Sequence, residues 1–413
     1  MKPSISKKVT TFKNKKSPIR EIMDLANPEF FRKVGLDPAD VISFSGGWVN
    51  HEAPNSMRSA YASIIDDSQK FHASGAYPPT IGMPECRKAI VDFEKHIYGD
   101  DMDLSPEQIA IGANSSQMTA NLMNIILDEG DKICMLDPTY ANYPAQASSI
   151  DNIEVIHFSV MDTENWKYVA NERKAEFAAF IKAEKPKMIM LCAPDNPTSQ
   201  IPSTGFVKAA LDAAKDIGAF LVIDFAYKEL VWQEDLPEYF SWGPNDNYIS
   251  IHSNSKWCRG LGRRLGWVEA PVEIISAFEA VQGATILCPD SLHQMALVEY
   301  IRNGITHNSI RPYIKETAKL YQKAAEQTVA SIEKHLGMPC LIPEGGLYTV
   351  MKVDMDSSEF THKILENTGV IVVPGWGFGK TLNNAVRLSY GPLVHHLDKI
   401  DEAMQRISKY LRG

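Results

Sequence analysis

The sequence predicts an α/β protein, in which a mostly parallel sheet is sandwiched by helices and a smaller α+β unit follows. Between about residues 105 and 270, short apolar runs rich in β-branched residues alternate with amphipathic helical patterns. That alternation is typical of parallel sheets covered on both faces. After about residue 290 the pattern changes, and a chain of 413 residues is long enough for two to three domains.

Six candidate strands make up the larger unit, and ligand chemistry in such a sheet belongs at the carboxyl ends of the parallel strands. In chain order the strands are 108–113, 132–137, 153–158, 187–194, 219–224 and 248–253. Helical patterns at 115–127 and 204–218 lie between them, the second with Ser203 or Thr204 as its cap. One long amphipathic helical stretch, 291–336, opens the smaller unit. Its candidate strands are 347–353, 370–375 and 385–390.

Composition excludes several classes of function. A net charge of -9 argues against nucleic acid as a partner, and no run reaches the roughly 18 apolar residues of a membrane span. Residues 1–16 carry six lysines, no acid and no apolar stretch, which indicates a basic flexible tail rather than a secretory signal. Six cysteines without a CxxC pair indicate buried free thiols in a reducing compartment. We therefore expect a cytoplasmic protein.

Residues 253–266, SNSKWCRGLGRRLG, gather four cationic side chains within nine residues. Like charges this close repel one another, and a solvated basic face would rarely also contain three glycines. Flexible backbone, small hydroxyls and cations around one lysine indicate an anion held beside a lysine that does chemistry.

Polar residues also follow most of the predicted strands, where they could serve one ligand. Taken singly, each group is more often a turn or a helix cap. Their order and their common position at strand ends favour the functional interpretation. The groups are Asn114-Ser115-Ser116-Gln117, Asp137-Pro-Thr-Tyr140, Asp195-Asn196-Pro-Thr198, Asp224-Phe-Ala-Tyr227 and Ser253-Asn-Ser-Lys256.

This set resembles the class I/II aminotransferase family, the fold-type I enzymes that use pyridoxal 5'-phosphate. Lys256 stands in the family's S-x-S-K-x(7)-R-x-G pattern, with Arg264 eight residues on and Gly266 after it. The Asn196 and Asp224 groups follow in family order. Tyr77 to Arg87 resembles the Y-x(4)-G-x-P-x-L-R element, with Cys86 in place of leucine, and Arg387-Leu-Ser-Tyr390 resembles a late strand of the family.

The resemblance runs from Ser17 to the C-terminus and implies a two-domain fold. The large domain would hold the cofactor on a mostly parallel, seven-stranded sheet. The small α+β domain would combine the C-terminus with the N-terminal segment. The expected boundaries are a tail at 1–16, an N-terminal arm at 17–60, a large domain at 61–300 and a small domain at 301–413.

The resemblance also implies catalytic roles, with Lys256, Asp224 and Tyr227 at the centre. Lys256 would bond the cofactor aldehyde and then move the substrate's proton. Neighbouring cations and burial must lower its pKa, because a free lysine is almost wholly protonated at neutral pH. Asp224 would pair with the pyridine nitrogen. Asn196 and Tyr227 would bond the phenolic oxygen, and Tyr140 would stack on the ring.

The cofactor phosphate would lie between Arg264, Ser253 and the helix N-terminus at Ser115 and Ser116. Tyr77 matches a residue that reaches the phosphate of the neighbouring subunit. A homodimer with shared active sites is therefore expected. Arg259 and Arg263 match no invariant role and would be surface or interface residues, and no metal is expected.

Substrate contacts are implied for Arg387, which would bind the α-carboxylate, and for Gly47, Trp48 and Asn196. The Ser17-Pro-Ile-Arg20-Glu21 segment resembles the aminoadipate and kynurenine branch, so Arg20 is either a substrate selector or part of an ordinary surface ion pair. The stretch 282–289 lacks an arginine that aspartate aminotransferases use there, which argues against a dedicated aspartate enzyme.

The favoured function is the transfer of an amino group from an L-amino acid to a 2-oxo acid such as 2-oxoglutarate. Two alternatives remain. A pyridoxal-phosphate lyase or cyclase is suggested by Trp48, Asn50 and His51, which replace the family's usual loop residues. In that loop His51 is either an extra acid-base group or, more in keeping with a loop, a solvated histidine. A cofactor-sensing domain of a transcription regulator is the third possibility, although we expect no long DNA-binding unit.

Overall fold

A computed structural model of the protein describes residues 4, 5, 9, 22 and 27–413. The predicted basic tail lies mostly outside the described residues. Arg20 and the rest of the Ser17–Glu21 segment lie outside them entirely.

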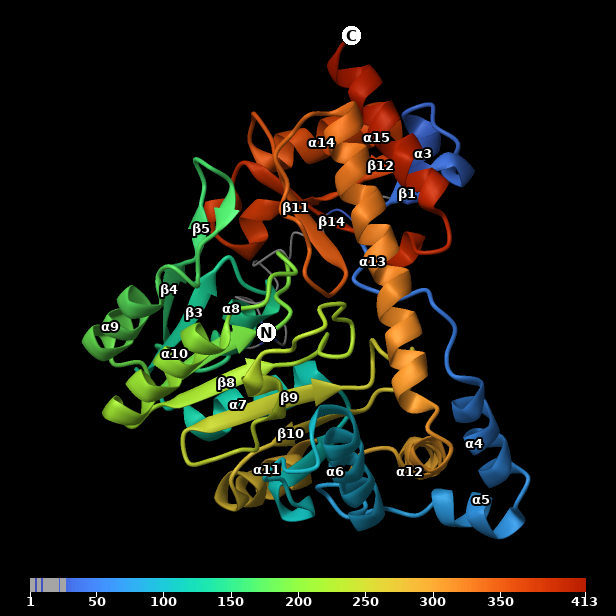
Figure 1. Ribbon diagram of the computed structural model, residues 1–413, viewed down its shortest axis with the longest axis vertical. Coiled ribbons are helices and arrows are strands. Elements are labelled where there is room, and N and C mark those ends of the chain that lie inside the picture. The colour runs from blue at the N-terminus through green and yellow to red at the C-terminus, as the bar shows by residue number, and fades with distance from the viewer. Residues whose placement is uncertain (1–3, 6–8, 10–21, 23–26) are drawn as a thin grey trace.

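A seven-stranded sheet forms the large lower part of the molecule (Figure 1). Six strands are parallel to one another and one, β10, is antiparallel to both of its neighbours. The spatial order is β2 (Ile109–Gly112), β10 (Gly266–Glu269), β9 (Tyr248–Ser253), β8 (Phe220–Asp224), β7 (Met188–Cys192), β3 (Lys132–Asp137) and β4 (Glu154–Ser159). All six strands predicted from the larger unit are present, so the predicted mostly parallel sheet is confirmed.

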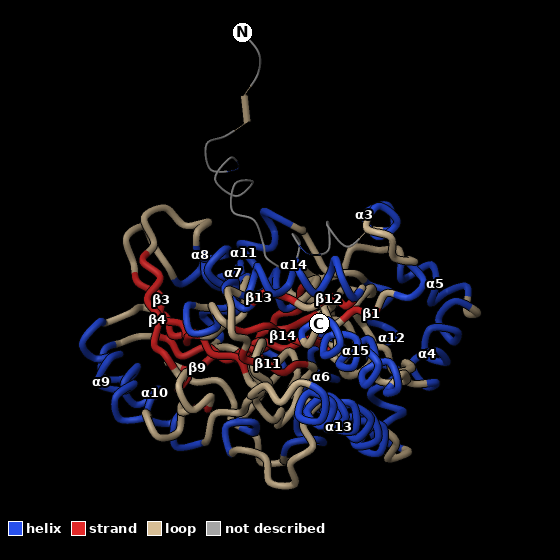
Figure 2. The backbone as a smooth tube through the Cα atoms, turned by 90° about the horizontal axis from the view of Figure 1, so that it is seen from above, coloured by secondary structure: helices blue, strands red, loops and turns tan. Residues whose placement is uncertain are grey.

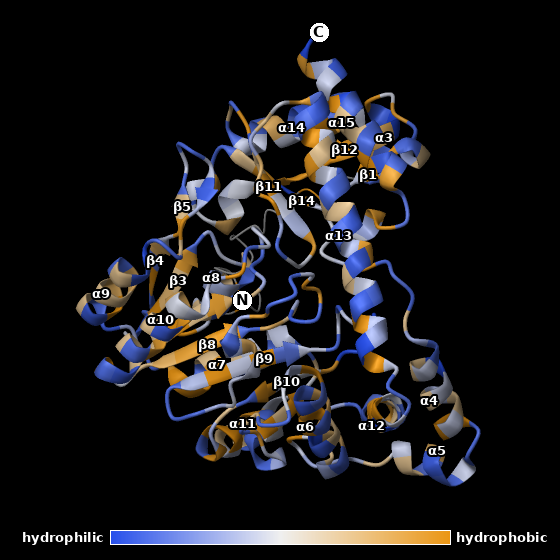
Figure 3. Cartoon of the chain, in the orientation of Figure 1, coloured by the Kyte–Doolittle hydropathy of each residue, from blue (hydrophilic) through white to orange (hydrophobic). Residues whose placement is uncertain are grey.

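Helices cover both faces of this sheet, which explains why its strands are apolar without alternation. On β7, Met188 and Met190 pack with α7 on one face, while Ile189 and Leu191 pack with α9 and α10 on the other. In Figure 3, β8 is accordingly coloured mostly orange, for hydrophobic residues. The covering helices are α6 (Pro84–Tyr98), α7 (Ser115–Ile126), α8 (Asn142–Ala147), α9 (Lys174–Glu184), α10 (Thr204–Ile217) and α11 (Val272–Thr285).

β10 was not among the strands predicted from the sequence, for an identifiable reason. The strand has four residues, GWVE, that begin with glycine and end with a glutamate, so it lacks the apolar run used to find the others. It forms because it lies between β2 and β9 and pairs with both. Glu269 is buried there by contacts that only the folded chain provides.

The smaller upper part contains two short sheets, seen from above in Figure 2. In one, β1 (Ile42–Ser43) pairs parallel with β12 (Val370–Ile371), so the N-terminal segment joins the C-terminal part as predicted. The other has the order β11 (Tyr348–Lys352), β14 (Ala385–Ser389) and β13 (Val373–Pro374). The helices here are α3 (Pro28–Lys33), α14 (Ser357–Thr368) and α15 (Leu397–Leu411), and a further hairpin pairs β5 (Met161–Asp162) with β6 (Lys167–Tyr168).

The long helical stretch predicted at 291–336 is two helices rather than one. α12 (Ser291–Thr306) packs against α4 (Asn55–Ile65) and α5 (Ser68–Ser74), and α13 (Ile310–His335) runs up the side of the molecule to the small part (Figure 1). The chain turns between them at Asn308, whose φ is 47°. Asparagine tolerates that left-handed conformation, which ends a helix without a glycine.

In the described part of the chain, no helix has both the length and the apolar character needed to cross a bilayer. All six cysteines are free thiols: four are buried, and Cys288 and Cys340 are partly exposed.

Candidate active site

A cavity of about 130 Å³ opens at the carboxyl ends of the parallel strands. Nearly all of the residues predicted to bind the cofactor line it, although they come from five separate segments. The predicted residues in its wall are Ser115, Ser116, Tyr140, Asn196, Asp224, Tyr227, Ser253, Lys256 and Arg264. Asn114, Tyr143, Cys192, Ala226, Ser255 and Leu261 complete the lining.

Lys256 follows β9 and reaches into the cavity, where its Nζ donates to the carbonyl oxygen of Gly47 at 2.5 Å. Burial, together with the positive charges of Arg387 and Arg264, lowers its pKa to about 8, against the opposing effect of Asp224. This is the direction that the sequence analysis required, and desolvation is its main cause. At neutral pH a useful fraction of the amine is therefore unprotonated.

Asp224, the last residue of β8, is buried and faces the cavity. Its Oδ2 accepts a hydrogen bond from the hydroxyl of Tyr143 at 2.8 Å, and its Oδ1 accepts one from the backbone N–H of Ala226 at 2.9 Å. Burial raises its pKa, while these two hydrogen bonds and the nearby His252 favour the carboxylate. The Asp224 carboxylate is therefore shielded from solvent, and the stability of its negative charge depends on the hydrogen bonds and charges around it.

Hydrogen bonds link four polar side chains, two of which line the cavity: Tyr348, Tyr227, Asn196 and Arg387. Tyr227 accepts from Asn196 Nδ2 at 3.4 Å and shares a 2.8 Å hydrogen bond with the hydroxyl of Tyr348. Arg387 Nη1 donates to Asn196 Oδ1 at 3.0 Å, and its Nη2 donates to the carbonyl of Ser45 at 2.9 Å. These contacts bring a strand of the small part, β14, against the wall of the large one.

Arg387 is fully buried, with its guanidinium over the rings of Tyr348 at 4.4 Å and Phe378 at 4.7 Å. Its Nε has no hydrogen-bond partner, and within the described residues it forms no ion pair with a carboxylate. A buried cation without a counter-ion is costly. The arrangement therefore fits an anionic ligand group that arrives from outside the chain.

The start of α7 contributes an anion-binding part of the cavity wall. Asn114 caps this helix, accepting from the N–H of Gln117 at 2.9 Å, and Asn114, Ser115 and Ser116 line the cavity where the positive end of the helix dipole favours an anion. Gly266 allows β10 to approach this turn, because a Cβ there would lie 2.6 Å from the nitrogen of Ser115. Arg264 adds a positive charge, and the hydroxyls of Ser253 and Ser255 are hydrogen-bonded to each other at 2.8 Å.

The other two cations of the 253–266 motif point away from the cavity. Arg259 Nη1 donates to the carbonyl of His51 at 2.6 Å, and Arg263 is exposed, with its guanidinium 5.5 Å from the ring centre of Tyr61. Neither lines the cavity, and Arg259 is half-buried. Of the four cations of this motif, Lys256 and Arg264 line the cavity.

His51 is not the solvated loop histidine that the sequence analysis favoured. It is buried, with Nε2 3.0 Å from the carbonyl of Trp257 and Nδ1 2.8 Å from the hydroxyl of Tyr321. Since a carbonyl only accepts, Nε2 carries the proton and Nδ1 accepts from Tyr321. Burial lowers the pKa of His51 to about 4, so it is a neutral structural residue that fixes the loop beside Lys256.

The substrate-side residues of the same loop are placed by close packing. The Trp48 ring lies on Gly46, where a Cβ would fall 1.7 Å from the ring, and 41% of Trp48 is exposed. Gly47 touches the hydroxyl of Tyr348, 2.6 Å from where its own Cβ would lie. Tyr77 does not reach the cavity of its own chain and is 84% exposed. Its proposed role in a neighbouring subunit stays a prediction.

A family model described as aminotransferase class I and II matches residues 39–407 of the chain. The chain belongs to the class I and II aminotransferases. Enzymes of the aspartate aminotransferase type in this family use pyridoxal phosphate. The predicted family, enzyme class and cofactor are therefore confirmed, whereas the finer placement in the aminoadipate and kynurenine branch stays a prediction.

Relatives match this aminotransferase over most of their length. Aspartate aminotransferase of Pyrococcus horikoshii is 26% identical over 97% of this chain and 95% of its own. Aspartate/prephenate aminotransferase of Thermus thermophilus is 24% identical over 89% and 91%. Among solved structures, the Thermus thermophilus aspartate aminotransferase with maleate superposes with a TM-score of 0.83 at 22% identity, covering 99% of this chain and all of that one. The last comparison confirms the fold.

The cavity of this aminotransferase fits the cofactor by the chemistry of its donors. The α7 amides with Arg264 suit a phosphate, buried Asp224 suits a protonated ring nitrogen, and Lys256 suits an aldehyde. Sequence reasoning missed Tyr143 and Tyr348. Tyr143 lies three residues after Tyr140, so it could have been found as part of the same Pro-Thr-Tyr segment, whereas nothing local marks Tyr348.

The backbone conformation of Ser199 is unusual for a serine. Ser199 directly follows the Asn196-Pro-Thr198 group, and its φ is 56°, in the left-handed region that favours glycine. Its Oγ accepts a hydrogen bond from the N–H of Tyr348 at 3.0 Å. The backbone conformation of Ser199 is less favourable for serine than for glycine, but the serine side chain accepts a buried hydrogen bond from β11, the strand that carries Tyr348.

Proposed function

We propose that this aminotransferase moves the amino group of an L-amino acid to a 2-oxo acid, with 2-oxoglutarate as acceptor, in two half-reactions at the Lys256 site. The observation that carries the proposal is a lysine with a pKa of about 8 in a cavity walled by Asp224, Tyr227 and Arg264. The pKa of this amine is close to neutral pH, which suits a group that must both form a covalent bond and carry a proton.

When bound, pyridoxal phosphate supplies a ring that accepts the electron pair released as the substrate's Cα–H bond breaks. Lys256 Nζ is the base that takes this proton and returns it in the reverse direction. With a pKa of about 8, roughly a tenth of the lysine is neutral at pH 7, against about 0.03% for an unperturbed lysine at 10.5. Burial raises the pKa of Asp224, and the hydrogen bonds from Tyr143 and Ala226 favour its carboxylate, which would hold a proton on the ring nitrogen.

Arg387 orients the substrate. Its buried guanidinium has a free Nε and lies over two aromatic rings, so a carboxylate reaching it finds a rigid, desolvated partner. Its contact with Asn196 ties that carboxylate site to the wall of the cofactor cavity. The proton on the substrate's Cα is thereby presented to Lys256.

The substrate class is supported by the relatives, whose names include aspartate, aspartate/prephenate and LL-diaminopimelate aminotransferase. Each named compound carries an additional carboxylate or a second amino-acid group. We infer that the donor of this enzyme is an amino acid with a polar or anionic side chain. Arg20 is the selector candidate, so Arg20→Ala should reduce kcat/KM for acidic donors more than for apolar ones.

A cytoplasmic homodimer with shared active sites completes the proposal. Tyr77, exposed on a single chain, would be covered by the second copy, and its hydroxyl would reach that copy's phosphate site. Sedimentation of the cofactor-loaded protein tests this directly. A monomer saturated with cofactor would contradict it.

The deciding experiment is the visible spectrum of the purified protein with added pyridoxal phosphate, titrated with single amino acids. A cofactor band that a donor removes and 2-oxoglutarate restores supports transamination, and the concentrations required rank the donors. Release of ammonia without such recovery would favour the lyase or cyclase alternative. Lys256→Ala is the control and should show no lysine-bound cofactor band.

A further inference from the structure

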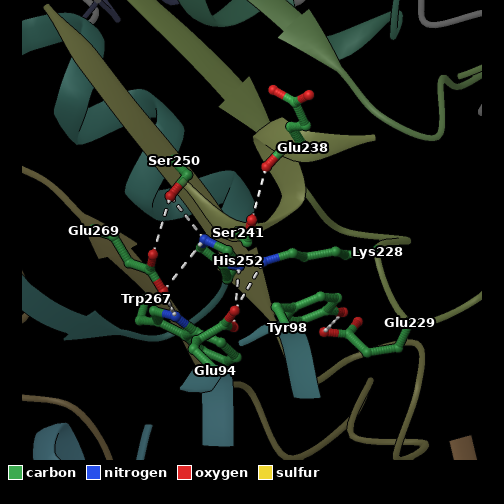
Figure 4. A network of polar contacts seen from close by, with 10 residues as sticks. All are labelled: Glu94, Tyr98, Lys228, Glu229, Glu238, Ser241, Ser250, His252, Trp267 and Glu269. Carbon is green, nitrogen blue, oxygen red and sulfur yellow. Dashed lines mark hydrogen bonds and ion pairs between the residues drawn. The ribbon is translucent and has the colours of Figure 1, made fainter. Parts of the chain in front are cut away.

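A buried cluster of ionisable side chains lies beside β9, and Figure 4 shows how its members face one another. It consists of Glu94 of α6, Lys228 after β8, His252 of β9 and Glu269 of β10, and we call these four the Glu94 cluster. Each of them is at most 2% exposed. None of them lines the cavity, and the mechanism above does not use them.

One carboxylate faces two partners at the centre of this cluster. Glu94 Oε2 is 2.8 Å from the ammonium of Lys228, and Glu94 Oε1 is 3.6 Å from Nδ1 of His252. On the other edge of the imidazole, Nε2 of His252 is 3.4 Å from Glu269. The Lys228 ammonium also lies 3.7 Å from the ring centre of Tyr98.

The two partners of Glu94 belong to the two segments that carry the cofactor chemistry. Lys228 directly follows Tyr227 and is four residues from Asp224, and His252 directly precedes Ser253 and is four residues from Lys256. Side chains alternate between the two faces of a strand, so Ser253 faces the cavity and His252 faces Glu94. Glu94 therefore contacts both segments, on the face that lies away from the cavity.

Stability alone is a weak reason for such a cluster. Replacing a buried ion pair by apolar residues is often neutral or stabilising, because the charges lose their hydration on folding. A fixed separation between two segments is supplied by contacts at set distances, here the 2.8 Å hydrogen bond from Lys228 to Glu94 and the 3.6 Å approach of His252 to the same carboxylate.

A metal ion is a poorer explanation. Glu94, His252 and Glu269 could each bring one ligand atom within 4.8 Å of the others. However, Glu94 faces Nδ1 and Glu269 faces Nε2, and one ion bonds only one of these nitrogens. Lys228 already supplies a positive charge to Glu94, at hydrogen-bond distance.

We propose that Glu94 is a positioning residue for the cofactor site. By holding Lys228 and His252 together, it fixes the Asp224–Tyr227 segment relative to the Ser253–Lys256 segment. The inference rests on the proposed function of Lys256 as the cofactor lysine. It assigns a role to a residue of α6 that touches neither cofactor nor substrate.

The test compares Glu94→Gln with the double variant Glu94→Gln/Lys228→Met. The single variant leaves a buried ammonium unpaired, so its Tm should fall, whereas the double variant removes that charge and should regain most of the Tm. If the cluster positions the site, both variants should bind pyridoxal phosphate about tenfold more weakly, because displaced groups bind a rigid ligand poorly. Asp92→Asn is the matched control on α6, where Asp92 pairs with Lys88 at 2.9 Å on the exposed face. It should change neither the Tm nor the Kd.

Cofactor affinity is measured as the Kd from the visible absorbance band, alongside the Tm and the separate kcat and KM values. A double variant that regains both the wild-type Tm and the wild-type Kd would overturn the inference, since the cluster would then be only structural. So would a stoichiometric divalent metal in the wild-type protein that Glu94→Gln loses. A wild-type protein without the band would instead refute the proposed function, and the inference with it.

Discussion

Tyr143→Phe removes one hydroxyl from the site and leaves the ring in place. That hydroxyl donates to Asp224 Oδ2 at 2.8 Å. Asp224 is buried, and the other hydrogen bond that its carboxylate accepts from the described residues comes from the backbone N–H of Ala226. A hydrogen bond to a charged group contributes about 1.5–3 kcal/mol. Losing it should therefore reduce kcat/KM by roughly tenfold to 150-fold.

The pH dependence of the loss has a definite sign. Burial raises the pKa of Asp224, and the Tyr143 hydroxyl acts against that rise. Without the hydroxyl the pKa rises further, so the carboxylate that must hold the ring nitrogen's proton becomes scarcer as pH falls. The deficit of Tyr143→Phe should be largest at acidic pH and should shrink as pH increases.

The assay is kcat/KM for the best donor across the pH range in which the protein stays folded. Tyr140→Phe is the matched control, because it also keeps a ring and loses a hydroxyl, one that accepts from Asn142 at 2.9 Å rather than donating to Asp224. If Tyr143→Phe and Tyr140→Phe show the same activity at every pH, the argument that Asp224 depends on Tyr143 is wrong.

Three further predictions concern the lysine, a glycine and two histidines. Lys256→Ala should abolish turnover with little change in Tm, and measurable transamination by this variant would reject the assignment. Gly266→Ala places a Cβ 2.6 Å from backbone at the start of α7 and should cost about 1–3 kcal/mol of unfolding free energy by denaturant titration, whereas Gly262→Ala, with nothing within 4 Å, should not. Burial lowers the pKa of His51 and of His293 to about 4, so the unfolded state binds more protons between pH 6.5 and 4. Unfolding free energy should fall by about 3 kcal/mol per histidine over this range, and His51→Gln should flatten the profile.

Much of the large sheet and the cavity wall could be predicted from the sequence. The strands are recognisable because a parallel sheet buried on both faces requires continuous apolar runs, as in β7, where all five residues are buried. Since parallel strands end at one edge, the polar groups that follow β3, β7, β8 and β9 were predicted to converge. Nearly all of the predicted cofactor residues line one cavity.

Other features depend on contacts between distant parts of the chain. Tyr143 and Asp224 are 81 residues apart in the sequence, and Arg387 and Asn196 are 191 apart. Tyr348 has no motif around it, and its role follows only from the 2.8 Å contact with Tyr227. The sequence analysis misplaced His51 because a polar loop residue is usually solvated, and only packing against Tyr321 and Trp257 buries it.

The sequence by itself determined the fold class, the order of the strand ends and the lysine at the centre of the chemistry, because hydrophobic periodicity and short motifs are local properties of the chain. Only the tertiary structure decided which groups are desolvated and which charges face them. Desolvation lowers the pKa of Lys256, raises that of Asp224 and leaves the Nε of Arg387 without a partner. Burial is a property of the whole fold, and in this protein it converts a recognisable motif into a reactive site.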